Sequence, residues 1–294
     1  MQGALALAAG VLYVGRHETT AHVRPYDWDG RPIAPGFSFR GPEGEPCELV
    51  GLDVDEDRHL WVADRRSNSV RVFTIFGREV DSLGGTTLAG VDARGAWSEL
   101  SGLAWQPPAS EDDEGSLLVT RGGWLRHAVQ RVSREGTWLA SLRPKGDPLG
   151  KFHDVLAVAQ AGPWTYVAEG RPGRIQVFRE GDFHFSYTVP ARPGAKFEPT
   201  GLAPLPDGRL VVACGGDDSA LLLLDAAGRL ISVLAHGGRA DGEVLAPNDV
   251  VLEPGEGGAS ARLAVIDQDA ERVQVFTLTG RCYGELDELP GRAQ

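Results

Sequence analysis

The pattern of residues 61–73, WVADRRSNSVRVF, occurs twice more along this chain. Residues 166–178 read YVAEGRPGRIQVF and residues 264–276 read AVIDQDAERVQVF, so the three copies share their length and their order of apolar and charged residues. Self-similarity at a long fixed period is typical of propellers and solenoids. The pattern therefore predicts a repeat protein.

Weaker copies of the pattern lie between the strong ones, each an apolar run that follows a turn or loop. Measured at the last residue of this run, successive copies are 48, 57, 48, 45 and 53 residues apart. The longest interval contains a polar insertion at 107–115, PPASEDDEG, which predicts a loop. Six copies with a period of about 50 residues thus fill the chain. The six reference positions are Arg16, Asp64, Arg121, Glu169, Cys214 and Asp267.

Each copy contains four short apolar stretches separated by turn residues. In the second copy these are VGLDV, HLWVAD, SVRVFTI and EVDSL, separated by DEDR, RRSN and FGR. Short alternating stretches of this kind predict half-buried strands, and no long stretch has a helical period. We therefore predict an all-β protein, a six-bladed β-propeller with four antiparallel strands per blade. The predicted blades of this single domain are residues 1–45, 46–98, 99–150, 151–196, 197–245 and 246–294.

The three strong copies resemble the NHL repeat, in which an apolar-Ala-Asp turn precedes an Arg-Ile-Gln-Val-Phe strand. The resemblance extends more loosely to the other three copies and implies a six-bladed NHL-type propeller. Propellers of this family serve as protein-binding, RNA-binding and enzymatic platforms, so the resemblance leaves the function open. The segments GALAL and CYGEL, near the two termini, each belong to a complete copy. We therefore expect the ring to close without a shared blade, and that seam to open first on heating.

Composition narrows the class of protein. Twenty-nine basic residues face 41 acidic ones in a chain of 294, a formal net charge of −12, which disfavours a nucleic-acid partner. Three widely spaced cysteines form no C-x-x-C pair and predict a reduced, cytoplasmic protein. No apolar run reaches the roughly 18 residues of a transmembrane helix. A closed propeller has no free sheet edge that demands pairing, so we expect a monomer.

Acidic residues at the ends of second strands have basic partners nearby. Glu169 precedes Arg174, and Asp267 precedes Arg272, by five residues across one turn. This spacing predicts an ion pair, or a carboxylate that accepts the amides of the turn. Asp64 has no arginine at this offset, so we expect it to cap its turn alone. We interpret these acids as structural.

A second polar group precedes the first strand of each blade, where the innermost strands enter the central channel. The alignment treats Val155 and Val250 as equivalent to Gly51. Short polar side chains here can hydrogen-bond their own loop-to-strand junctions, the interpretation that we favour. They also form an oxygen-rich set that would suit calcium, which takes six to eight oxygen ligands. The group comprises Glu48, Glu99, His153, Asp154, Glu198, Asn248 and Asp249.

This group resembles the metal site of calcium-dependent lactonase and gluconolactonase propellers, where an Asn or Asp before a first strand holds the metal. The resemblance implies that role for Asp154 and Asp249. That family also has a metal-binding Glu at the start of its first blade, where this chain has Gln2 and Gly3. The amidating lyases with NHL repeats use several histidines around zinc, and only His153 is similarly placed, so calcium suits the group better than zinc. The predicted cation ligands are Glu48, Asp154, Glu198, Asn248 and Asp249.

Arginines are frequent in the connections between second and third strands, on the same face. Such a patch would suit an acidic protein segment better than RNA, because Arg and Trp are enriched at protein-binding hot spots. The alternative is a solvated rim without a partner. The candidate partner-binding residues are Arg65, Arg66, Arg121, Trp124, Arg126 and Arg171.

No complete catalytic constellation survives the alignment of the six blades. We therefore predict a binding scaffold that takes a protein or small-molecule partner at its central funnel face. The alternative is a metal-dependent hydrolase, similar to a lactonase, or a lyase, with a divalent cation in the funnel and His153 as the general base.

Overall fold

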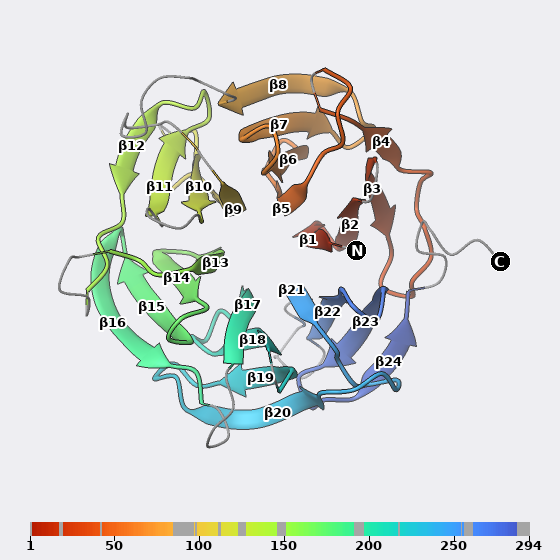
Figure 1. Cartoon of the computed structure of the whole chain (residues 1–294), viewed down its shortest axis with the longest axis vertical. Helices are drawn as coiled ribbons and strands as arrows, with labels where there is room; N and C mark the ends of the chain where they lie inside the picture. The colour runs from red at the N-terminus through yellow and green to blue at the C-terminus, as the bar shows by residue number, and fades with distance from the viewer. Residues whose placement is uncertain are drawn as a thin grey trace.

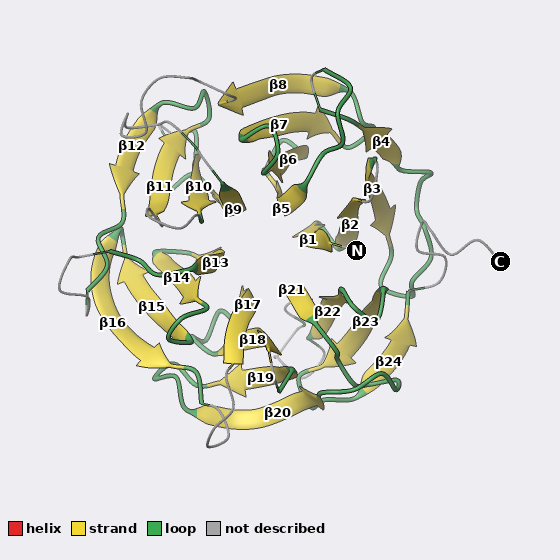
Figure 2. Ribbon diagram, viewed as in Figure 1, coloured by secondary structure: helices red, strands yellow, loops and turns green. Residues whose placement is uncertain are grey.

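The protein is a six-bladed β-propeller in the computed structural model (Figure 1). Six sheets of four antiparallel strands surround a central axis, and the described residues contain no helix, so none that could span a membrane (Figure 2). The predicted fold is therefore confirmed. The structure describes residues 2–17, 20–41, 43–84, 97, 99–110, 113–122, 128–145, 151–190, 197–216, 218–253, 255 and 261–286.

Within each blade the strands follow one another in sequence order from the centre outward (Figure 1). The first three blades consist of β1 (Gln2–Ala8), β2 (Val11–His17), β3 (Ala21–Tyr26) and β4 (Phe37–Phe39); β5 (Leu49–Val54), β6 (His59–Asp64), β7 (Ser69–Thr74) and β8 (Glu79–Gly84); and β9 (Leu100–Gln106), β10 (Ser116–Arg121), β11 (Ala128–Ser133) and β12 (Trp138–Ser141). The last three consist of β13 (Val155–Ala161), β14 (Trp164–Glu169), β15 (Arg174–Arg179) and β16 (Asp182–Thr188); β17 (Phe197–Pro204), β18 (Leu210–Gly216), β19 (Ala220–Leu224) and β20 (Leu230–His236); and β21 (Pro247–Glu253), β22 (Arg262–Asp267), β23 (Arg272–Thr277) and β24 (Cys282–Glu285).

The ring closes without a shared blade. All four strands of blade one come from the N-terminal end of the chain, and all four strands of blade six come from the C-terminal end. This confirms the predicted closure. The two terminal blades meet where β21 lies beside β1 (Figure 1), a contact that we call the closing seam.

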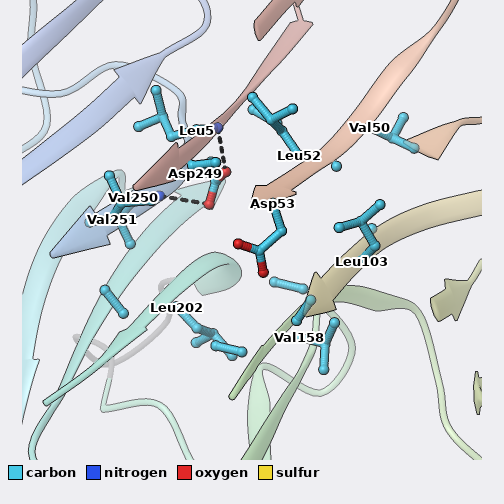
Figure 3. A pocket seen from close by; sticks show the side chains of 18 of the residues that line it. Leu5, Val50, Leu52, Asp53, Leu103, Val158, Leu202, Asp249, Val250 and Val251 are labelled. Carbon is cyan, nitrogen blue, oxygen red and sulfur yellow. Dashed lines mark hydrogen bonds between the residues drawn. The ribbon is translucent and has the colours of Figure 1, made fainter. Parts of the chain in front are cut away.

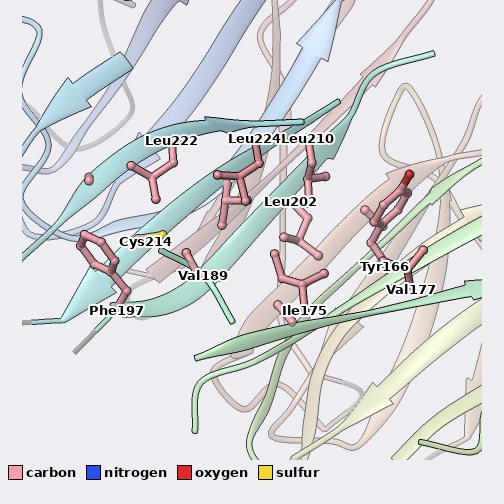
Figure 4. Close-up of a cluster of buried hydrophobic side chains, with 14 residues drawn as sticks. Tyr166, Ile175, Val177, Val189, Phe197, Leu202, Leu210, Cys214, Leu222 and Leu224 are labelled. Carbon is pink, nitrogen blue, oxygen red and sulfur yellow. The ribbon is translucent and has the colours of Figure 1, made fainter. Parts of the chain in front are cut away.

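The hydrophobic core lies between neighbouring blades. Between blades four and five, Tyr166 and Ile175 pack against Leu210 and Leu222 (Figure 4). These side chains are almost fully buried because strand alternation points every second residue at the adjacent blade. Each buried leucine or isoleucine contributes about 1.5 to 3 kcal/mol to the free energy of unfolding.

A β-bulge recurs near the start of the innermost strand in blades two to six. One residue is skipped in the ladder with the second strand, so the strand bends as it enters the channel. Counted from the bulge, Ala157 and Asp249 are equivalent to Gly51, and the sequence alignment was therefore wrong by two residues in blade four and one in blade six. The bulged residues are Val50, Ser101, Leu156, Thr200 and Asn248.

Candidate functional site in the central channel

The six innermost strands surround a cavity of about 360 Å³ on the axis of the ring. Aliphatic side chains lie around it, among them Leu5, Leu52, Leu103, Val158 and Leu202 (Figure 3), but polar atoms form at least as much of its exposed surface as apolar atoms do. Concave cavities of this size are a common form of small-ligand site.

Two positions of the innermost strands hold small residues in most blades, because the backbone of the next blade approaches closely. A Cβ atom on Gly51 would lie 2.8 Å from the amide nitrogen of Leu103. Two blades carry an aspartate at one of these positions. The first position is Ala4, Gly51, Gly102, Ala157, Gly201 and Asp249, and the second is Ala6, Asp53, Ala104, Ala159, Ala203 and Val251.

Asp249 joins the two blades of the closing seam. Its Oδ2 accepts a hydrogen bond from the amide of Leu5 in β1 at 2.8 Å, and its Oδ1 accepts one from Val250 at 2.8 Å (Figure 3). Beside it, the side-chain amide of Asn248 donates to the carbonyl of Gly3 at 2.8 Å. Both Asn248 and Asp249 line the cavity, where the sequence predicted them, and both are hydrogen-bonded to β1.

Asp53 makes the same kind of link between blades two and three. Its Oδ2 accepts from the amide of Trp105 in β9 at 2.7 Å, and its Oδ1 accepts from Val54 at 2.8 Å. Figure 3 shows its carboxyl group projecting into the cavity that Asp249 also lines. Sequence reasoning missed Asp53. The available signal was an acid at a position where four of the other five repeats have alanine.

Burial sets the electrostatics of the two channel acids, Asp53 and Asp249. Desolvation raises the pKa of Asp53 to about 6, although amide bonds oppose the shift and the nearby carboxyls of Asp55 and Glu56 add to it. Desolvation likewise raises the pKa of Asp249 to about 7, with a further rise from Asp53. Both side chains keep a partly exposed surface towards the cavity. Removal from water disfavours the charged form of each group.

The acids at the ends of second strands are structural, as predicted. Glu169 is fully buried and accepts hydrogen bonds from Arg174 Nε at 2.5 Å, Gln176 Nε2 at 2.8 Å and the backbone amide of His153 at 2.6 Å. Asp64 accepts from the amide of Arg66 and thus caps its own turn, as expected.

The second predicted pair is looser than the first. Asp267 and Arg272 lie 3.9 Å apart, and the carboxylate instead accepts the amides of Leu245 and Ala246, both at 2.8 Å. Arg272 binds Glu285 at 3.0 Å. The alternative of a carboxylate that accepts backbone amides therefore describes this blade better, although the amides belong to the preceding loop.

Three of the predicted cation ligands lie outside the channel cavity. Glu48 pairs with Arg65 at 2.9 Å, Asp154 lies 3.8 Å from Arg171, and Glu198 is in β17 without lining the cavity. Asp154 directly precedes β13, as predicted, but counted from the bulge it is equivalent to Glu48 and not to Val50. Whether these residues hold a metal stays a prediction.

The candidate base His153 is exposed and does not line the cavity. Among the described His, Cys, Asp and Glu residues, one group of three brings its ligand atoms within 4.8 Å of one another: Asp55, Asp57 and His59. Arg134 already occupies that group, at 2.6 Å from Asp55 and 2.7 Å from Asp57. None of the predicted cation ligands belongs to it.

The arginine patch is smaller than predicted. Arg66 and Arg171 are exposed, and Arg65 is half-buried, with its Nε donating to the carbonyl of Leu100 at 2.8 Å. The expected exposure of Arg121 is wrong, because its position at the end of β10 is equivalent to that of Asp64 and faces the interior. The remaining two, Trp124 and Arg126, lie outside the described residues.

A family comparison supports the repeat assignment. Residues 47–73, which span β5 to β7, match the model of the NHL repeat. The resemblance seen in the sequence is thereby confirmed for residues 47–73, and the six-bladed fold that the resemblance implied is confirmed as well. No curated protein matches the sequence at a significant level.

Solved structures with the same fold differ in function. A chain from a nidogen/laminin complex matches with a TM-score of 0.64 at 16% identity, over 94% of this chain and 92% of that one. A streptogramin B lyase matches with a TM-score of 0.62 at 13% identity, over 98% and 83%. A protein of unknown function from Bacteroides caccae matches with a TM-score of 0.52 at 14% identity, over 78% and 80%. At these identities the likeness establishes the fold alone.

Proposed function

We propose that this propeller is a binding scaffold that holds a small ligand in its central channel. The cavity between the innermost strands carries the proposal, because it brings two carboxyl groups from different blades to one enclosed space with both polar and aliphatic lining. Asp53 and Asp249 each lose solvent on folding without gaining a cationic partner, as their raised pKa values indicate. A desolvated acid at the edge of a cavity is a candidate binding group.

The enzymatic alternative has less support. Matches to a lyase and to a nidogen/laminin complex show that one fold carries different functions, so the likeness favours neither class. The described lining residues include no histidine, and His153 lies outside the cavity. A metal-dependent hydrolase would further need several free oxygen ligands at one point. Asp249, the predicted ligand that lines the channel with Asn248, already accepts two amides.

The test is to block the channel. Val158 and Val251 line the cavity from β13 and β21, so Val158→Trp combined with Val251→Trp fills part of it. Ile231→Trp, on the exposed outer strand β20, is the matched control. We expect ligand-observed NMR with a panel of small metabolites to find compounds that bind the wild type and the control but not the blocked variant.

The proposal fails if bound compounds bind the blocked variant equally well, because their site then lies elsewhere. It also fails if no compound of a chemically broad panel binds the wild type. Circular dichroism of the blocked variant confirms that it is folded before either result is interpreted.

A further inference from the structure

We propose, building on the channel-binding function above, that the ligand is a small organic cation: a protonated amine with an aliphatic body, held between Asp53 and Asp249. The inference goes beyond binding as such because it names the chemical class of the ligand. It is carried by the charges that face the cavity, the free acceptor positions on the two carboxylates and the composition of the wall.

The charge that faces the cavity is negative. Among the described lining residues the charged side chains are Asp53, Asp249 and Arg65. Arg65 is already engaged, since its Nη1 lies 2.9 Å from Glu48 and its Nε donates to Leu100. Within the described part of the chain, the two carboxylates therefore have no cationic partner. The formal net charge of −12 favours the approach of a cation further.

Both carboxylates keep acceptor capacity. Each oxygen of Asp249 accepts one backbone amide, and the same holds for Asp53. An ionised carboxylate offers about four acceptor positions, so about two remain on each group. The amides fix both groups to the backbone, so a ligand would meet preorganised acceptors. An ammonium group supplies three N–H donors to such acceptors.

Part of the wall can also accommodate a short hydrocarbon chain, because aliphatic side chains lie beside the polar surface. Leu5, Leu52, Leu103, Val158 and Leu202 surround the carboxyl groups (Figure 3). A strongly hydrated ion would gain nothing from these side chains, whereas an alkyl group buried here gains about 0.8 kcal/mol per CH₂. Calcium would also need six to eight oxygens, and two amide-bonded carboxylates supply few of them. An alkylammonium ion matches both the acids and the wall.

The probe is n-hexylamine, compared with the neutral n-hexanol and the anionic hexanoate, which have a similar chain. We expect calorimetry at pH 8 to show binding of hexylamine with at least about tenfold preference over both, because one charge-assisted contact is worth that much. Asp249→Asn and Asp53→Asn should each weaken the binding of hexylamine about tenfold and leave the binding of hexanol unchanged. The matched control is Asp207→Asn, a change of the same kind at an exposed carboxylate outside the cavity.

Lower pH should also weaken the binding of the amine. Burial raises the pKa of both acids, and the charges of Asp55 and Glu56 on Asp53, and of Asp53 on Asp249, raise them further, so both acids take up a proton as the pH falls towards 5. Hexylamine should therefore bind more weakly at pH 5 than at pH 8, while hexanol should not change. A loss that is shared by hexanol would instead mark a change of the fold.

Three results would overturn the inference: equal binding of hexylamine and hexanol, tighter binding of hexanoate, or displacement of hexylamine by stoichiometric calcium. If hexanol or hexanoate binds the wild type but not the channel-blocked variant, the proposed function stands and the amine class fails. If neither the three probes nor the metabolite panel shows channel-dependent binding, both fail together. Should either Asn variant be unfolded, the pH dependence of the wild type decides alone.

Discussion

Carboxylates are buried both at the turns of the blades and in the central channel, but their hydrogen-bond partners differ. In blade four, Glu169 is surrounded by an arginine, a glutamine and a backbone amide. In the channel, Asp249 receives two backbone amides and no cation, and burial raises its pKa to about 7. The partners of Glu169 use its acceptor positions and make its removal costly, whereas the acceptor positions that remain on Asp249 are available to a ligand.

The largest expected loss of stability follows from removing Glu169, the buried acid with a cationic partner. Glu169→Ala leaves the guanidinium of Arg174 and the amide of Gln176 without their acceptor, so we expect the free energy of unfolding to fall by about 3 to 5 kcal/mol. Denaturant titration measures it. Asp182→Ala, at an exposed acid of the same blade, is the control and should change stability by less than about 0.5 kcal/mol. A loss below about 1 kcal/mol for Glu169→Ala would show that this pair is not matched as described.

The channel acids should have the opposite pH dependence from an ordinary salt-bridged acid. The folded-state pKa of Asp249, about 7, lies above its unfolded value, near 3.8, so the folded protein binds the proton more tightly. Its contribution is therefore fully present below about pH 4 and is lost as the pH rises through 7. We expect the cost of Asp249→Asn to be about 3 kcal/mol smaller at pH 8 than at pH 4.5.

Urea titrations of the wild type and Asp249→Asn at both pH values measure this difference, and background titrations of other groups cancel in the comparison. Asp53→Asn should behave in the same way over a window that ends near pH 6. An equal cost at both pH values would mean that the channel acids are solvated as surface acids are.

The closing seam should open before the other blade contacts. Asn248 and Thr200 are equivalent bulged residues, and each bonds the next blade: Asn248 donates to Gly3, and the Thr200 hydroxyl donates to Pro247 at 2.6 Å. Blades five and six are also joined covalently by the chain, whereas blades six and one are held together by non-covalent contacts alone. Asn248→Ala should therefore cost about 1 kcal/mol and accelerate hydrogen exchange in β1.

Thr200→Ala is the matched control, and it should leave exchange in β1 unchanged. Mass spectrometry of exchange near the unfolding midpoint measures both variants. Faster exchange in β13 than in β1 of the wild type would contradict the order of opening.

The smallest effect is expected at the rim. Glu48→Gln removes an ion pair with Arg65 in which both side chains are about one-third exposed. We expect a loss of less than about 1 kcal/mol in the free energy of unfolding, because solvent screens such pairs. A loss above about 2 kcal/mol would show that this pair is coupled more strongly than an exposed ion pair.

Local patterns allowed much of the fold to be predicted. The recurrence of WVADRRSNSVRVF, together with the weaker copies between the strong ones, predicted six blades, and the spacing of Glu169 and Arg174 predicted their contact across one turn. The alignment of the innermost strands failed in blades four and six, because a bulge inserts a residue without changing the apolar pattern. Asp53 was missed because the pattern VGLDV does not distinguish it from an ordinary solvent-facing residue of a strand.

The sequence by itself determined six four-stranded blades and the pairing of Glu169 with Arg174, because these depend on residues a few positions apart. Only the tertiary structure decided that Asp53 and Asp249, 196 residues apart in the chain, line one cavity. Their desolvation, and hence their raised pKa values, arises where six strands from the whole length of the chain converge on one axis. No local spacing encodes that convergence, since it exists only when the ring has closed.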